Sequence, residues 1–169
     1  MRINSLAYLQ IRAFYFIILI FLVLFYMLTG CASSYQMDLD SSETHKINIE
    51  QILREELKLW IYTPYSMGGT KFGGTDCSGF VMIVYDKLFR ITLPRDTINQ
   101  ATAGVFINKK ELKPGDLVFF KPPKIRRHVG IYLNSGEFAH TSSRKGVTIS
   151  RIDDPYWNKY YWTSRRILP

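Results

Sequence analysis

Hydrophobic periodicity changes from helical spacing to strand spacing near residue 113. Apolar residues fall three or four positions apart between residues 47 and 62, which predicts an amphipathic helix. Further helices are predicted over 77–89 and, more briefly, over 96–102. Short apolar segments then predict strands at 117–120, 129–133, 137–140 and 147–151. Helices that precede an antiparallel sheet predict an α+β fold.

Turn-forming residues separate these segments. A loop with four glycines comes before the second helix, which Asp76 or Thr75 can cap, and the glycines let the loop backbone approach a neighbouring group closely. Residues 134–136, Asn-Ser-Gly, predict a hairpin between the second and third strands. Residues 155–161 predict a helical turn before a last strand that runs toward Ile167.

An apolar segment extends from Phe14 to Leu28 and is preceded only by the cations Arg2 and Arg12. This layout is typical of a secretory signal peptide. The segment is shorter than the roughly 20 residues that a membrane-spanning helix needs, but an uncleaved anchor that includes its neighbours is the competing interpretation. We therefore predict a signal peptide over residues 1–30.

The end of this segment, Leu28-Thr29-Gly30-Cys31, resembles a bacterial lipobox. The resemblance implies that Cys31 becomes the lipid-modified first residue of the mature protein, and two or more acyl chains attach a protein stably to a membrane. Residues 31–46 are polar and lack apolar periodicity, which predicts a flexible tether in which His45 is an exposed bystander. Ala32 favours the outer membrane, because the inner-membrane retention signal of lipoproteins usually has Asp at that position.

Charge and composition indicate the expected partners. The formal net charge is +8, and removal of residues 1–30, which hold two cations and no acid, leaves +6. We expect a basic exported chain to contact anionic phospholipid head groups and the carboxylate-rich cell wall, and not nucleic acid. A basic surface with no role in recognition is the alternative. With 47% hydrophobic residues, the segment 47–169 can form one folded domain, which we expect to be a monomer.

Cys77 is the thiol that remains once Cys31 carries lipid, so no internal disulfide is expected. It opens the second predicted helix, where the helix dipole lowers the pKa of a thiol. The backbone N–H groups of residues 76–78 can form an oxyanion hole at the same place. A small buried core cysteine is the alternative interpretation.

Two histidines are candidates for the base. His128 and His140 lie on segments joined by the predicted hairpin, so their rings can be adjacent on one face of the sheet. Together with Cys77 they fit a nucleophile, a base and a third group that orients the base. The same three residues can also be considered as zinc ligands, but they lack the short paired spacings of zinc motifs. No metal or cofactor is expected.

A series of motifs, in order over residues 49–168, resembles the NlpC-type peptidoglycan endopeptidases. The motifs are Thr63-Pro64-Tyr65, Gly68-Gly69, Asp76-Cys77-Ser78-Gly79-Phe80, Leu93-Pro94-Arg95, residues 114–120, residues 128–132, Phe138-Ala139-His140, Tyr156-Trp157 and Arg165-Arg166-Ile167. The resemblance implies a papain-like core, with helices packed on an antiparallel sheet. It also implies that Cys77 is the nucleophile, His128 the base and His140 the orienting residue. Further residues with implied roles are Tyr65 near the oxyanion, and Asp76, Ser78 and Arg95 as structural or substrate-contacting positions.

The resemblance implies hydrolysis of amide bonds in peptidoglycan stem peptides or cross-links, on the periplasmic side of a bacterial cell envelope. Two alternatives stay open: a lipoprotein that binds the wall without cutting it, and an amidase or acyltransferase on the same fold. Residues 121–127 depart from the family pattern because they are unusually basic and proline-rich. We expect the four cations of this segment to form a basic rim beside the cleft that meets stem-peptide carboxylates. They are Lys121, Lys124, Arg126 and Arg127.

Overall fold

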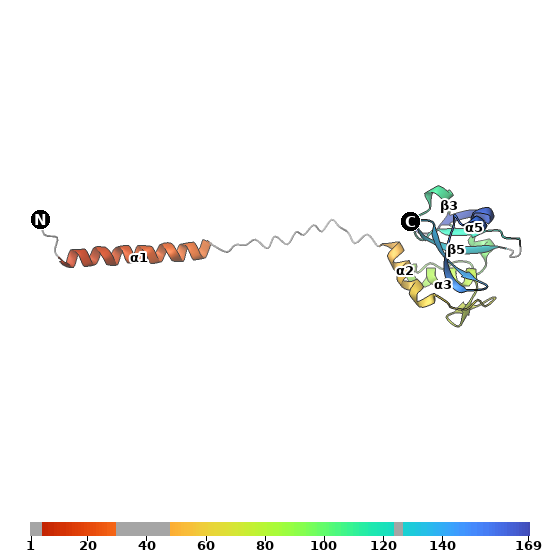
Figure 1. Ribbon diagram of the computed structural model, residues 1–169, viewed down its shortest axis with the longest axis horizontal. Helices are drawn as coiled ribbons and strands as arrows, with labels where there is room; N and C mark the ends of the chain where they lie inside the picture. Colours follow the sequence, from red (N-terminus) through yellow and green to blue (C-terminus); the bar gives the residue numbers. More distant parts are fainter. Residues whose placement is uncertain (1–4, 30–47, 124–126) are drawn as a thin grey trace. The chain divides into compact units, whose positions relative to one another are not determined.

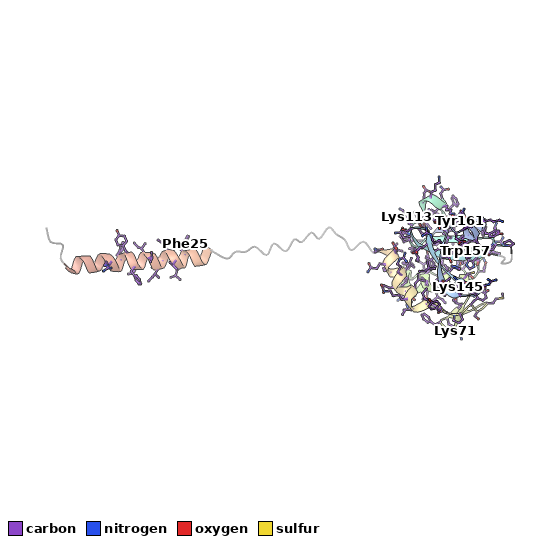
Figure 2. The ribbon with its side chains drawn as sticks, viewed as in Figure 1. Phe25, Lys71, Lys113, Lys145, Trp157 and Tyr161 are labelled. Atoms are coloured by element: carbon purple, nitrogen blue, oxygen red, sulfur yellow. The ribbon has the colours of Figure 1, made fainter. Side chains whose placement is uncertain are left out.

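The computed structural model describes residues 5–29, 48–123 and 127–169, which belong to two units, Met1–His45 and Lys46–Pro169 (Figure 1). The first unit contains the helix α1 (Ser5–Thr29). Its side chains from Phe14 to Phe25 are exposed and project from the ribbon in Figure 2. Among the described residues, no helix combines the length and hydropathy that a membrane crossing requires. The predicted tether, with Cys31 and His45, lies outside the described residues.

The helices of the second unit begin at side-chain caps. They are α2 (Ile49–Trp60), α3 (Cys77–Phe89), α4 (Thr97–Gln100) and α5 (Pro155–Tyr160). Asp76 is the cap of α3, and Asp96 and Asp154 have the same role in α4 and α5, because each carboxylate accepts hydrogen bonds from N–H groups of the first turn. These elements confirm the predicted helices to within a few residues.

Six antiparallel strands form the sheet, in the order β3-β8-β4-β5-β6-β7. The strands are β3 (Val105–Phe106), β4 (Leu117–Phe120), β5 (His128–Asn134), β6 (Glu137–Ser142), β7 (Gly146–Arg151) and β8 (Tyr161–Arg166). The α+β prediction and the hairpin at residues 134–136 are confirmed. Sequence reasoning missed β3 and the hairpin β1 (Thr70–Lys71) and β2 (Gly74–Thr75), because two-residue strands show no periodicity.

Both faces of the sheet are covered, which explains why β4 is apolar at every position. Leu117 and Phe119 pack into the core that α2 and α3 form with the sheet, and these two helices lie beside β5 in Figure 1. Val118 and Phe120 point to the opposite face and pack with Trp157, the α5 residue labelled in Figure 2. Alternate residues of a strand point to opposite faces, so a strand covered on both sides needs apolar residues throughout.

Candidate active site

The start of α3 is fixed by Asp76 and by the glycine-rich loop. One carboxylate oxygen of Asp76 accepts from the N–H of Gly79 at 2.8 Å, and the other accepts from the N–H of Gly68 at 2.8 Å. A Cβ at Gly79 would lie 2.3 Å from the carbonyl oxygen of Gly69, so only glycine fits where the loop crosses the helix. The group that the loop backbone approaches closely is therefore the first turn of α3, and this contact holds the loop against the helix.

Arg95 completes this network. Its guanidinium donates to both carboxylate oxygens of Asp76, at 2.9 and 2.7 Å, and to the Oγ of Ser78 at 3.0 Å. Burial acts to raise the pKa of Asp76, but the Arg95 hydrogen bonds and the N–H groups of Gly79 and Gly68 outweigh it, so the pKa is lowered. Asp76, Ser78 and Arg95 thus surround the residue at the start of the helix, and all three border the cleft described below.

Cys77 is the first residue of α3, and its thiol is partly buried against the core. Burial raises the pKa of the Cys77 thiol above its usual value of 9.0, although the backbone N–H of Val129 and the Thr97 hydroxyl act to lower it. The Sγ of Cys77 lies 3.8 Å from the Oγ1 of Thr97. Cys77 does open the helix as predicted, but the direction of its pKa differs from the expected lowering, because burial is the largest influence on the thiol.

The two histidines come from adjacent strands. The β5–β6 register pairs Ile131 with Ala139, and its continuation sets Gly130 opposite His140, so that His128 is the diagonal neighbour of His140 on the same face. Their rings meet with Nε2 of His128 2.9 Å from Nδ1 of His140. A Cβ at Gly130 would lie 2.6 Å from both the Ala139 carbonyl oxygen and the Phe138 ring. The adjacency predicted from the hairpin is confirmed, and Gly130 makes room for it.

Aromatic rings enclose this histidine pair. Trp157 stacks on His128, with centroids 5.2 Å apart, and presents its edge to His140. The side chains of His128 and His140 are only 4% and 2% exposed. Burial lowers the pKa of His128 to about 4, and burial together with the nearby His128 lowers the pKa of His140 well below its usual value. Both rings are therefore neutral at neutral pH.

One cleft of about 1200 Å³ brings the sequence-predicted residues together. It is bordered by Cys77, His128 and His140 and by all four of the further candidates, Tyr65, Asp76, Ser78 and Arg95. Burial, and then the proximity of Cys77 and Asp76, raise the pKa of Tyr65. Among the described residues, no group of three or more His, Cys, Asp or Glu side chains has an arrangement suited to a metal ion.

The basic segment only partly borders this cleft. Arg127 lines it, and its Nε is buried without a hydrogen-bond partner in the described part of the chain. The Lys121 ammonium lies 3.7 Å above the centroid of the Trp162 ring and does not line the cleft. Lys124 and Arg126 lie outside the described residues. Of the four predicted rim cations, Arg127 therefore borders the cleft and Lys121 does not, while Lys124 and Arg126 stay predictions.

Sequence reasoning missed two side chains of the site. Thr97 contacts the thiol from α4, and Trp157 encloses the histidines from α5. Neither belongs to a residue type that signals catalysis, and both reach the site through tertiary packing. The Tyr156-Trp157 pair was nevertheless part of the family resemblance, which was the one available signal.

A thiol at the start of a helix that shares a cleft with a buried imidazole pair from an antiparallel sheet is the arrangement of a papain-like cysteine peptidase. Comparison with known proteins identifies the family within this class. The chain belongs to the NlpC/P60 family, whose model matches residues 62–166. Members of this family are cysteine peptidases, and it includes peptidoglycan hydrolases.

Individual relatives agree with this assignment. The chain is 41% identical over 143 residues to the probable endopeptidase NlpC of Escherichia coli K12, an alignment that spans 83% of this chain and 93% of the relative. It is 36% identical over 138 residues to the murein DD-endopeptidase MepS/murein LD-carboxypeptidase of the same strain, over 80% of this chain and 73% of the relative.

Solved structures show the same fold. An NlpC/P60 family protein from Bacillus cereus matches with a TM-score of 0.65 and 34% identity, over 71% of this chain and 40% of that protein. The NlpC/p60 domain of the peptidoglycan hydrolase SagA matches with a TM-score of 0.60 and 30% identity, over 71% of this chain and 99% of that domain. The present chain therefore spans about two fifths of the Bacillus cereus protein and nearly all of the SagA domain.

Proposed function

We propose that Cys77, His128 and His140 hydrolyse an amide bond in peptidoglycan stem peptides. The main observation that supports this proposal is that the Cys77 thiol and the buried His128–His140 pair border one cleft. In the resting site the thiol and both rings are neutral, so we infer that His128 acts as a general base when substrate binds.

The proposed reaction has two steps, acylation of Cys77 and hydrolysis of the acyl-enzyme. The sulfur of Cys77 attacks the carbonyl carbon as its proton passes to His128, and the carbonyl oxygen becomes an oxyanion near the N–H groups of Cys77 and Ser78. The N–H of Asp76, which the sequence also suggested for this role, donates instead to the Gly69 carbonyl oxygen at 3.4 Å. His128 then protonates the departing amine, and an acyl-enzyme forms. Water, deprotonated by His128, attacks the acyl carbon and releases the carboxylic acid together with the free thiol.

The assay should contain two kinds of bond, because the names of the relatives include a DD-endopeptidase and an LD-carboxypeptidase. Purified sacculi, a cross-linked muropeptide dimer and a linear muropeptide are incubated with the protein, and mass spectrometry identifies the new termini. We expect the wild type to release fragments, and Cys77→Ala and Cys77→Ser to release none while keeping the wild-type circular dichroism spectrum. Fragment release by Cys77→Ala would exclude the mechanism, and unfolding would favour a core role for Cys77. Loss of a stem peptide from its sugar would indicate an amidase.

We propose further that residues 1–30 are a signal peptide, that Cys31 carries lipid and that residues 31–46 tether the domain 47–169 to the outer membrane. The sequence pattern at Cys31 supports this proposal, and the basic charge of the chain suits an envelope location. Radiolabelled palmitate should enter the wild type but not Cys31→Ala, and Cys31→Ala should leave the membrane fraction. Equal labelling of both proteins would contradict lipid attachment at this residue.

A further inference from the structure

A row of three polar side chains crosses three adjacent strands. His128 on β5 contacts His140 on β6, and the Nε2 of His140 lies 2.9 Å from the Oγ of Ser150 on β7. The β6–β7 register pairs His140 with Thr148 and Phe138 with Ser150, so Ser150 is a diagonal neighbour of His140 on the same face. The row therefore ends at a hydroxyl that no catalytic motif of the sequence includes.

Burial leaves the two rings few other partners. Trp157 covers His128, and Phe138 stacks on His140 with centroids 5.0 Å apart. A buried ring nitrogen without a partner is unfavourable, so the nitrogens of the row depend on one another, on Ser150 and, for His140, on the backbone of Thr141. Because the lowered pKa values keep both rings neutral, each ring carries one N–H.

Two arrangements of the ring protons give each hydrogen bond of this row one donor and one acceptor. In the first, His128 donates its Nε2–H to His140, and His140 donates its Nε2–H to Ser150; the Nδ1 of His128 then has a free lone pair for the thiol proton. In the second, Ser150 donates to His140 and His140 donates to His128. His128 then carries its proton on Nδ1 and cannot act as a base. The hydroxyl of Ser150 is compatible with either arrangement, because it can both donate and accept.

We propose that Ser150 is a positioning residue that accepts the Nε2–H of His140 and thereby sets the tautomer of both histidines for catalysis. Ser150 also borders a second depression, of about 370 Å³, whose lining includes Trp157 and the Arg151–Asp153 ion pair. Only the arrangement in which Ser150 accepts from His140 leaves the Nδ1 of His128 free for the thiol proton, so this is the arrangement that the proposed catalysis requires. The inference rests on the proposed roles of Cys77 and His128, but the tautomers can be measured without catalysis.

The test combines nitrogen-15 NMR of labelled histidines at neutral pH with kcat/KM on a muropeptide. We expect Nε2–H on both rings in the wild type. In Ser150→Ala we expect a population with Nδ1–H on His128 and a loss of about ten-fold in kcat/KM, mostly in kcat. Ser150→Thr keeps the hydroxyl and should restore both readouts. Cysteine is similar in size to serine but is a weak hydrogen-bond acceptor, so Ser150→Cys should behave like Ser150→Ala. It replaces Ser150→Ala in the test if that variant does not fold.

Thr148→Ala is the matched control, because Thr148 lies on the same strand directly opposite His140. It should keep the wild-type tautomers and rate. Wild-type tautomers in both Ser150→Ala and Ser150→Cys, or Nδ1–H on His128 in the wild type, would overturn the inference. Equal rate losses in Ser150→Ala and Thr148→Ala with unchanged tautomers would overturn it in favour of packing. Failure of the proposed function differs from these outcomes, because Cys77→Ala would then still cut peptidoglycan whatever the tautomers do.

Discussion

The Nε2 of His128 lies 2.9 Å from the Nδ1 of His140, and both rings are almost fully buried. In the proposed triad, a histidine thus occupies the place at which other catalytic triads have a carboxylate or an amide. A neutral imidazole at this position adds no negative charge, so it does not offset the effect of burial, which lowers the pKa of His128. The resting site therefore contains a neutral thiol and a neutral base.

The two histidines should differ in their sensitivity to substitution. His128→Ala removes the proton acceptor and should reduce kcat as strongly as Cys77→Ala. His140→Asn should retain a measurable fraction of activity, because its amide oxygen can accept near the position of Nδ1. His140→Leu, of similar bulk but without an acceptor, is the control and should retain less. Equal and complete loss in all of these variants, together with metal in the purified protein, would favour a zinc site.

The pH dependence of activity should reflect the neutral pair. Because the pKa of His128 is lowered to about 4, the acid limb of kcat/KM should lie well below the ordinary imidazole value of 6.5. Alkylation of Cys77 by iodoacetamide should be slow at neutral pH and should still be rising with pH at pH 9, since the pKa of the thiol is raised above 9.0. A fast alkylation rate that persists into the acid range would instead reveal a preformed thiolate–imidazolium pair.

The folded protein should lose stability in acid because the buried His128 ring resists protonation. Below pH 6.5 the unfolded chain protonates His128, whereas the folded protein resists protonation down to about pH 4, so the folded state loses stability across this window. The pKa difference corresponds to about 3 kcal/mol. Urea unfolding gives the free energy of unfolding of the wild type and of His128→Gln at each pH between 7.5 and 4. The contribution of His128 is the change with pH in the difference between these two curves. Parallel curves would show that His128 does not titrate differently in the two states.

Gly130 should tolerate no side chain. In Gly130→Ala the new Cβ would meet a strand carbonyl oxygen and the Phe138 ring at 2.6 Å, so β5 and β6 must move apart and separate the histidines. We expect a destabilisation of about 1–3 kcal/mol and a large loss of kcat. The control is Gly73→Ala, because no atom lies within 4 Å of a Cβ there. Wild-type activity in Gly130→Ala would contradict the geometric requirement.

Arg127 should contribute to substrate binding more than Lys121 does. Arg127 lines the cleft, and its Nε has no hydrogen-bond partner among the described residues. Its guanidinium lies 5.2 Å from the centroid of the Trp162 ring, and stem peptides carry free carboxylates that can pair with it. Arg127→Gln should raise KM about two- to ten-fold with little change in kcat, and the effect should shrink in high salt. Lys121→Gln, which removes a cation stacked on Trp162, is the control. A wild-type KM in Arg127→Gln would contradict a role of Arg127 in recognition.

The sequence by itself determined the element order, the capped start of α3 and the adjacency of the two histidines. These features follow from local rules: apolar spacing selects helix or strand, Asp76 caps a helix, and a short hairpin fixes which residues of β5 and β6 face each other. The tertiary structure decided what surrounds them. Thr97, Trp157 and Ser150 reach the site from separate elements, and burial reverses the direction predicted for the Cys77 pKa. Desolvation depends on every neighbour in space, and no local pattern in the chain encodes it.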